Sequence, residues 1–179
     1  ELVGKAQALA EMSQARVEIC LLGHEVEKLV AQIQNAGSSA IRVADDPALA
    51  TFSSAIFARV LADLAGLHKP QILLFGAGMR NASLAARVAA RLETGLSAHC
   101  VDLKFEGKNL VQTVPGFGGH LMANIICPDR RPQIATVTAG VFQAATRVDV
   151  APEIIKEKPQ IPAGLRGAKE VDRSTAGSM

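Results

Sequence analysis

Helical and strand-like patterns alternate through the first 95 residues, and this alternation constrains the fold more than any other feature of the chain. Four segments carry apolar residues at helical spacing: residues 1–14, 25–36, 52–64 and 82–92. Three short apolar runs between them are typical of buried strands: residues 16–22, 40–44 and 71–75. Strands that alternate with helices pair in parallel, because each crossover helix covers one face of the sheet. We therefore expect an α/β protein with a three-layer, doubly wound, mainly parallel sheet.

The pattern changes after residue 95, because the strand-like runs there follow one another without a helical segment. These runs are residues 98–105, 109–114, 121–127 and 133–138. Glu106, Gly107 and Lys108 have the composition of a hairpin turn. We expect added antiparallel strands after residue 95. A doubly wound domain usually begins with a strand, so we expect either a first strand upstream of Glu1 or another segment in its place in the sheet.

The 179 residues are enough for one domain of ordinary size with a packed core. We expect this domain to cover residues 1–148. From residue 149 the sequence is rich in proline and charge and has no periodic apolar face. Residues 149–179 are therefore predicted to form a linker or an extended tail, with one strand near residues 147–150.

Composition excludes several classes of protein. A hydrophobic content of 49% with 20% charged residues indicates a packed globular protein. The net charge of +2 and the absence of Trp and Tyr argue against nucleic-acid binding. No apolar run is long enough to insert in a membrane, and the first residues lack a signal-peptide pattern, so we expect a cytoplasmic protein. Its three cysteines, which form no CxxC pair, are predicted to be buried reduced thiols rather than metal ligands: Cys20, Cys100 and Cys127.

One candidate binding site is the glycine turn Gly76-Ala77-Gly78, which follows a predicted strand and precedes a helix. Backbone N–H groups at such a turn can hold a phosphate, and Arg80 and Asn81 stand next to it. The full spacing of a dinucleotide or phosphate-loop motif is missing. The turn is therefore either a nucleotide site or a tight structural turn. No histidine has a nucleophile at recognisable spacing, so the sequence predicts no catalytic residues.

A second candidate is the segment around residues 118–132, which joins a glycine pair to a charged loop. His120 follows Gly118 and Gly119, a position from which a side chain often reaches an interface. Arg131 and Pro132 belong to a loop that is either a basic rim for a partner or a charged connection between strands. We take these five residues as candidates for a partner interface.

Longer stretches carry a family resemblance. ARVAARLETGLSAHC, followed by LVQTVPGFGGHLMANIICPDRRPQIATVTAGVF, resembles the amino-terminal domain of the electron transfer flavoprotein α-subunit. LLGHEVEKL, VADDPALA and KPQILLFGAG fit the same family in the same order, so that the resemblance covers residues 1–145. It implies a nucleotide α-hydrolase-like fold. Val114 and His120 replace a usual arginine and asparagine, which predicts altered subunit contacts.

The resemblance also implies a function. Such a protein is a heterodimer with a β-subunit that carries electrons on one FAD from dehydrogenases, such as acyl-CoA dehydrogenase, to a downstream acceptor. It is an electron carrier rather than an enzyme. The family holds FAD mainly in a carboxyl-terminal α domain, and AMP, where present, in the β-subunit. The family's flavin-domain signatures are absent here, so we expect no cofactor in this chain alone. A eukaryotic source would place the protein in the mitochondrial matrix.

Two other functions compete with the electron carrier. The first is a nucleotide-binding protein that uses the turn at Gly76–Asn81. The second is a scaffold that self-associates through exposed sheet edges at the place of the expected first strand.

Overall fold

The computed structural model describes residues 1–148, 150–162 and 165. Its first half alternates between helices and strands, as the sequence predicts. In chain order the elements are α1 (Leu2–Ser13), β1 (Glu18–Gly23), α2 (Glu27–Ile33), β2 (Ala40–Asp45), α3 (Ser54–His68), β3 (Ile72–Gly76) and α4 (Met79–Arg91). Short 3-10 helices follow α2 and β2, at Gln34–Ala36 and Pro47–Leu49.

Strands dominate the second half. They are β4 (Leu96–Cys100), β5 (Asp102–Glu106), β6 (Asn109–Gly116), β7 (Leu121–Ile125), β8 (Gln133–Val137) and β9 (Glu153–Glu157). A 3-10 helix at Phe117–Gly119 joins β6 to β7.

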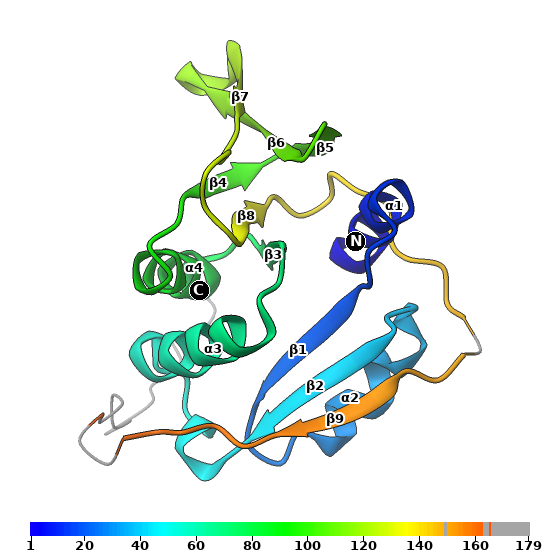
Figure 1. Ribbon diagram of the computed structural model, residues 1–179, viewed down its shortest axis with the longest axis vertical. Coiled ribbons are helices and arrows are strands. Elements are labelled where there is room, and N and C mark those ends of the chain that lie inside the picture. Colours follow the sequence, from blue (N-terminus) through cyan, green and yellow to red (C-terminus); the bar gives the residue numbers. More distant parts are fainter. Residues whose placement is uncertain (149, 163–164, 166–179) are drawn as a thin grey trace, which may run out of the picture.

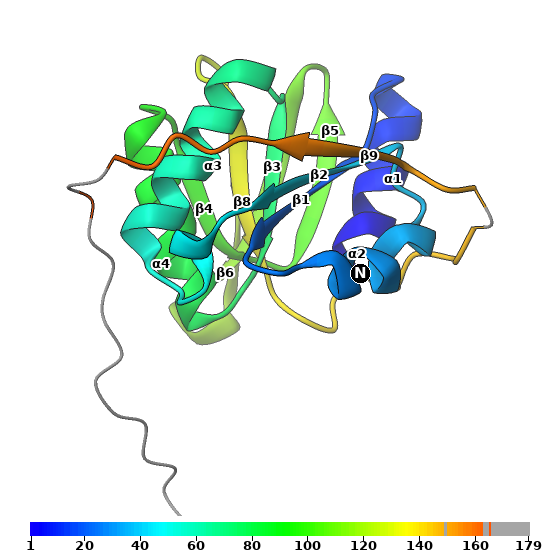
Figure 2. The same cartoon turned by 90° about the horizontal axis from the view of Figure 1, so that it is seen from below.

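The parallel strands form two sheets, with strand orders β1-β2-β9 and β3-β8-β4. They lie between α1 and α2 on one side and α3 and α4 on the other (Figure 2). Val26 at the start of α2 packs on Ile41 and Val43 of β2, whereas Leu84 and Val88 of α4 pack with α3. This arrangement confirms the three-layer, mainly parallel α/β fold.

Neither β1 nor β3 pairs along its second edge with any strand that the structure describes. The two strands face the middle of the molecule from opposite sides (Figure 1). No described segment takes the place of the expected first strand, and a strand upstream of Glu1 stays a prediction.

The third sheet is antiparallel, with the order β5-β6-β7. This confirms the antiparallel strands expected after residue 95. The outer half of β6, the 3-10 turn and β7 extend beyond β4 and the helices (Figure 1). We call residues 114–126 the arm.

One prediction after residue 95 is wrong in detail. The single strand expected at residues 98–105 is two strands in different sheets, β4 and β5. The β4 ladder shifts register between Ser97 and Cys100, and His99 has a φ of 57°, so the chain turns here from one sheet to the other. β4 and β8 do not belong to the antiparallel part, because they pair with each other in parallel.

The described residues near 147–150 do not form the expected strand. The strand in this part of the chain is β9, at Glu153–Glu157. β9 pairs in parallel with β2 and becomes the edge of that sheet. Proline and charge around β9 hid this strand from the sequence pattern, because an edge strand needs only one apolar face. The domain boundary at residue 148 stays a prediction.

Candidate functional site

The glycine turn lies at the carboxyl end of β3, as expected. The N–H of Ala77 donates to the carbonyl of Val137 at 2.7 Å, which extends the parallel pairing of β3 with β8. The side chain of Asn81 donates to the carbonyl of Gly76 at 2.9 Å and closes the turn. Gly78 precedes α4 and has extended backbone angles, so glycine is not required there. The Ala77 N–H and the Asn81 side chain thus stabilise the turn itself.

Arg80 lies in the first turn of α4 and is exposed. Its guanidinium carbon lies 5.6 Å from the centre of the Phe52 ring, a cation–π contact. The start of α4 has no side-chain cap, which leaves its positive dipole end open to an anion. Glu1 lies at the same edge of the β3-β8-β4 sheet, where its carboxylate accepts from the N–H of Gly140 at 2.8 Å. A negative charge at this edge weakens any attraction for phosphate.

Asp45 holds the corresponding end of β2. Its two carboxylate oxygens accept from the N–H groups of Glu25 and Val26 at 3.0 Å each. His24 lies 3.4 Å from the same carboxylate. The hydrogen bond from the Val26 N–H is the main reason that the pKa of Asp45 lies below its usual value. This carboxylate therefore ties the end of β2 to the two residues that lead into α2.

Two pockets lie away from the glycine turn. One, of about 330 Å³, is lined by α1 and residues 142–146. The other, of about 300 Å³, is lined by α3 and residues 157–160. Both volumes are at the lower limit for a drug-sized ligand, and a dinucleotide is larger. No cluster of His, Cys, Asp and Glu among the described residues has the geometry of a metal site.

A second group of candidates lies at the tip of the arm. Gly118 and Gly119 have φ values of 68° and 89°, and both are exposed together with His120. A Cβ on Gly119 would meet no atom within 4 Å, so these glycines serve the left-handed backbone and not close packing. Phe117 also has a positive φ, of 48°, although its ring is 84% exposed.

The arm carries apolar side chains that individual motifs did not reveal. Besides Phe117, the exposed apolar residues are Leu121, Met122, Ile125 and Ile126. Met122 is 56% exposed and Leu121 is 54% exposed. A contiguous exposed apolar surface typically marks a site of interaction. The signal in the sequence was the run of residues 114–126, which contains no Asp, Glu, Lys or Arg.

Arg131 and Pro132 belong to the interior of their loop. The guanidinium of Arg131 donates to the carbonyls of Arg130 and Cys127 at 2.8 Å and 3.0 Å. Its second nitrogen reaches the carbonyl of Lys108 at 3.3 Å. Pro132 is buried, and its carbonyl accepts from the Thr94 hydroxyl at 2.9 Å. The structure therefore places these two candidates apart from the glycine tip, in contacts that shape the loop.

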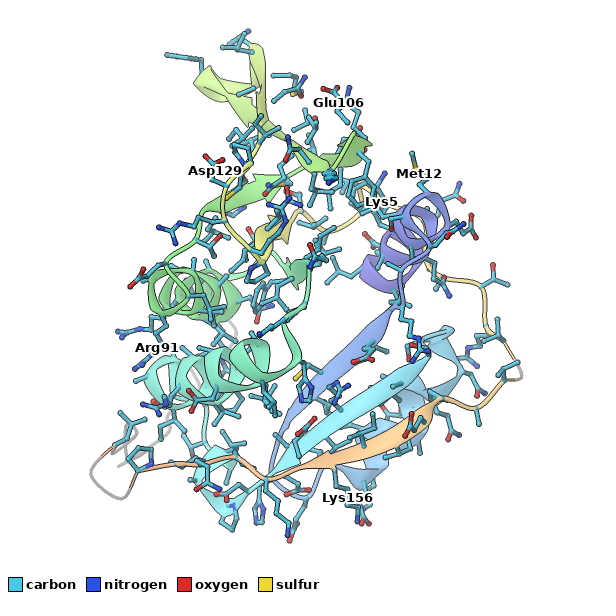
Figure 3. All side chains as sticks on the ribbon, in the orientation of Figure 1. Lys5, Met12, Arg91, Glu106, Asp129 and Lys156 are labelled. Carbon is cyan, nitrogen blue, oxygen red and sulfur yellow. The ribbon has the colours of Figure 1, made fainter. Side chains whose placement is uncertain are left out.

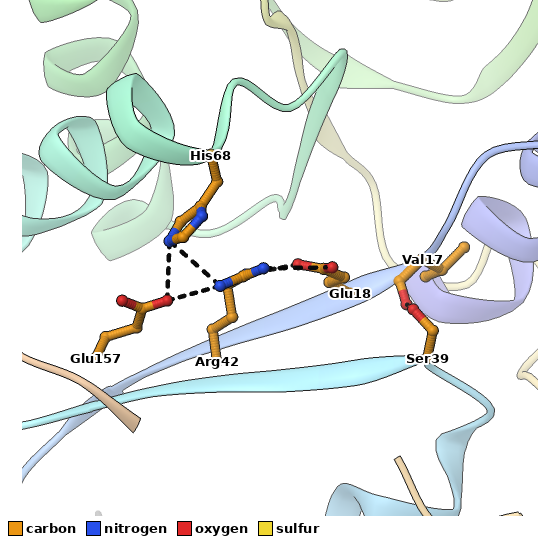
Figure 4. Close-up of polar contacts among 6 residues, drawn as sticks. All are labelled: Val17, Glu18, Ser39, Arg42, His68 and Glu157. Atoms are coloured by element: carbon orange, nitrogen blue, oxygen red, sulfur yellow. Dashed lines mark hydrogen bonds and ion pairs between the residues drawn. The ribbon is translucent and has the colours of Figure 1, made fainter. Parts of the chain in front are cut away.

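A charged cluster that the sequence did not reveal links three strands to α3 (Figure 4). Arg42 donates to Glu18 at 2.6 Å and to Glu157 at 2.8 Å. These hydrogen bonds raise the pKa of Arg42, which stays charged. His68 at the end of α3 lies 2.9 Å from the same carboxylate of Glu157. The cluster fastens β9 to β2 and α3, and its residues lie too far apart in sequence to form a motif.

The prediction of buried cysteines holds only in part. Cys100 is fully buried, and burial raises the pKa of its thiol to about 11. Cys127 is half-buried, whereas Cys20 is exposed on β1. The expectation for Cys20 is not met by its exposed surface. Burial by neighbouring atoms nevertheless raises the pKa of its thiol to about 12.

Comparison with known proteins identifies the family. The family model described as "Electron transfer flavoprotein domain" matches residues 1–170. This chain belongs to the electron transfer flavoprotein family. Within the described residues of this family member, no helix has the length and apolar character to cross a membrane.

Similar members of the electron transfer flavoprotein family are named as subunits of larger proteins. The chain is 41% identical over 150 residues to an electron transfer flavoprotein subunit alpha of Thermoanaerobacterium thermosaccharolyticum, covering 83% of this chain and 46% of the relative. It is 43% identical over 145 residues to the subunit alpha of Clostridium acetobutylicum, covering 80% and 43%. A lactate dehydrogenase (NAD(+),ferredoxin) subunit LctC of Acetobacterium woodii is 40% identical over 150 residues, covering 83% and 36%. The chain thus spans less than half the length of these relatives. In the two α-subunits it aligns with the amino-terminal part.

Proposed function

We propose that this chain is the amino-terminal domain of an α-subunit in an FAD-dependent electron carrier, which takes electrons from dehydrogenases and passes them to a downstream acceptor. The family match over residues 1–170, together with relatives named subunit alpha, carries this proposal. In this role the domain is a structural and docking module and contributes no catalytic residue.

FAD in this proposal binds outside the chain, on the carboxyl-terminal part of the complete α-subunit. AMP, where the complex contains it, belongs to the β-subunit.

The proposed partners are the electron transfer flavoprotein β-subunit and dehydrogenases such as acyl-CoA dehydrogenase. One relative, 36% identical over 169 residues, is named acryloyl-CoA reductase electron transfer subunit beta, of Anaerotignum propionicum. A chain of this type would work in the cytoplasm, or in the mitochondrial matrix if its source is eukaryotic. The exposed tip residues Gly118, Gly119 and His120 are proposed to belong to the subunit interface, with Arg131 and Pro132 shaping the loop behind it.

Co-expression tests this function. The chain is produced alone and together with the β-subunit of its source organism, and both preparations are examined by size-exclusion chromatography and visible absorption. We expect a 1:1 complex in the second preparation and a colourless protein in the first. Failure to form a complex would contradict the subunit assignment, and stoichiometric flavin on the chain alone would contradict the proposed place of FAD.

The uncapped start of α4 supports a second candidate, a nucleotide site at Gly76, Ala77, Gly78, Arg80 and Asn81. Calorimetric titration with AMP, ADP and ATP tests it. Micromolar binding that is lost in Arg80→Ala would favour nucleotide binding, whereas the absence of heat would favour the electron carrier.

β1 and β3 each have an edge that pairs with no strand in the described part of the chain, and this supports a third candidate, a self-associating scaffold. Sedimentation velocity of the chain alone distinguishes it. A monomer at every concentration would rule out the scaffold.

A further inference from the structure

The two edges of the antiparallel sheet differ in charge. The β5 edge carries Asp102, Lys104 and Glu106, with Lys104 and Glu106 paired at 3.1 Å. The β7 edge, LMANI, carries no charge and no proline. Charged residues and proline are the usual means by which natural proteins keep an exposed edge from pairing with another chain. The β5 edge has this protection, and the β7 edge lacks it.

The backbone of β7 is also oriented toward a further strand. The carbonyl of Thr113 on β6 accepts from the N–H of Val101 at 2.9 Å, so the main-chain groups of Thr113 point away from β7. Asn124 stands opposite Thr113 in the ladder. In an antiparallel ladder, two opposite residues either bond to each other or both point their main-chain groups away from the pair. The N–H and carbonyl of Asn124 therefore point to the free edge of β7. Met122, opposite Pro115, follows the same alternation.

The side chains of β7 are uncharged on both faces, and all of them except Asn124 are apolar. Leu121 and Ile125 alternate with Met122, and all three are more than 40% exposed. Residues 114–126 contain one titratable group, His120. Phe117 is exposed and has a left-handed backbone, a conformation that L-residues rarely adopt. A charged strand would find no opposite charge at the β7 edge, so an uncharged strand is the better match.

We propose that β7 accepts an extended, apolar strand of the β-subunit, so that the partner becomes the fourth strand of the β5-β6-β7 sheet. The inference rests on the proposed function and names the surface that binds the partner. Backbone hydrogen bonds from Met122 and Asn124 would give affinity, and the apolar side chains on both faces would give specificity.

The observations favour a protein strand over a lipid surface. Outward N–H and carbonyl groups remain unsatisfied in hydrocarbon, which makes an open edge costly there. The arm also lacks the lysine, arginine and tryptophan typical of interfacial anchors. A subunit fits better than a second copy of this chain, because these relatives are named as subunits.

The first test compares two substitutions at one position in the complex with the β-subunit. Asn124→Pro removes the outward N–H, whereas Asn124→Ala keeps it. Both lose the exposed hydrogen bond between the Thr113 hydroxyl and the Asn124 side chain. Since an orphaned acceptor in the interface is costly, we expect Asn124→Pro to raise the Kd by about tenfold or more relative to Asn124→Ala. Circular dichroism and thermal unfolding of both variants check that the fold is kept.

The second test probes the apolar surface with a matched control. Met122→Asp places a charge beside the edge, and we expect it to weaken binding by about tenfold or more. Met12→Asp makes the same change at a 70% exposed methionine on α1, away from the arm (Figure 3). This control should bind the β-subunit within about twofold of the wild type.

The outcomes separate the inference from the proposed function. A wild-type chain that forms no complex with the β-subunit overturns the proposed function. A wild-type complex that Asn124→Pro and Met122→Asp leave unchanged overturns only the strand-addition site. The chain alone could form dimers that Asn124→Pro dissociates, or bind phosphatidylcholine–phosphatidylglycerol vesicles in a way that Met122→Asp abolishes. Either result would assign the β7 edge to another occupant and overturn the strand-addition proposal.

Discussion

The inner and outer halves of the antiparallel sheet have similar apolar sequences but different surroundings. At the inner end, Leu103 and Leu110 are fully buried and share a core with Leu9 of α1. At the outer end, Leu121 and Met122 are more than half exposed. Apolar side chains favour burial against other apolar groups, but the sequence does not say whether the same chain or a partner provides those groups. The inner half is covered by its own domain, and we propose that the outer half is covered by a partner.

The strongest effect is expected in the inner half. Leu110→Ala should destabilise the chain by about 2 to 5 kcal/mol, because a fully buried side chain leaves a cavity. Chemical denaturation measures the change in the free energy of unfolding. A loss below about 1 kcal/mol would show that the inner half is packed more loosely than its burial implies.

A smaller effect is expected from the hydrogen bond that ties β6 to β8. The buried side chain of Gln133 accepts from the N–H of Leu110 at 2.8 Å. Gln133→Met keeps the volume but orphans this donor, and should cost about 1 to 3 kcal/mol. Gln143→Met, at an exposed position, is the control and should stay within about 0.5 kcal/mol. Equal effects of both substitutions would mean that the hydrogen bond does not stabilise the inner half.

An acid-sensitive contact lies outside the antiparallel sheet, at Asp45 in the parallel β1-β2-β9 sheet, whereas residues 114–126 of the arm contain no carboxyl group. The pKa of Asp45 is lowered in the folded state, chiefly by the Val26 N–H. Its stabilising effect is therefore present above the unfolded pKa of about 3.9 and is lost as the pH falls through the folded pKa. Denaturation at a series of pH values should show Asp45→Asn less stable than the wild type at neutral pH. The difference should shrink in acid, and a difference that grows in acid would contradict this account.

The smallest effect is expected at the outer end. Leu121→Ala should change the free energy of unfolding of the isolated chain by no more than about 0.5 kcal/mol, because the side chain is already 54% exposed. It is the same substitution as Leu110→Ala in the same sheet, and it therefore isolates the contribution of burial. A loss as large as that of Leu110→Ala would show that the arm is covered within the chain itself.

Much of the fold could be predicted from the sequence, because periodicity reports which face of an element is apolar. The alternation through β3 and the hairpin at Glu106–Lys108 were confirmed. The break between β4 and β5 was missed because a single left-handed residue, His99, has no composition signal. β9 was missed because edge strands have weak patterns.

The sequence also located the candidate site without predicting its contacts. The sequence located the glycine turn, but only the structure shows that Asn81 closes it and that Arg80 stacks on Phe52. It also located the charged loop, but not that Arg131 binds the carbonyls of its own loop. Hydrogen-bond partners of polar side chains depend on geometry, which neighbouring residues in sequence do not specify.

The sequence by itself determined the family, the fold class and the uncharged character of residues 114–126. These properties are local, since each depends on the order of residue types along the chain. The tertiary structure alone decided which apolar residues are covered, which edge of the antiparallel sheet is protected by charge, and that Arg42 joins Glu18 to Glu157. Each of these properties depends on segments far apart in the chain, which come together only when the protein folds.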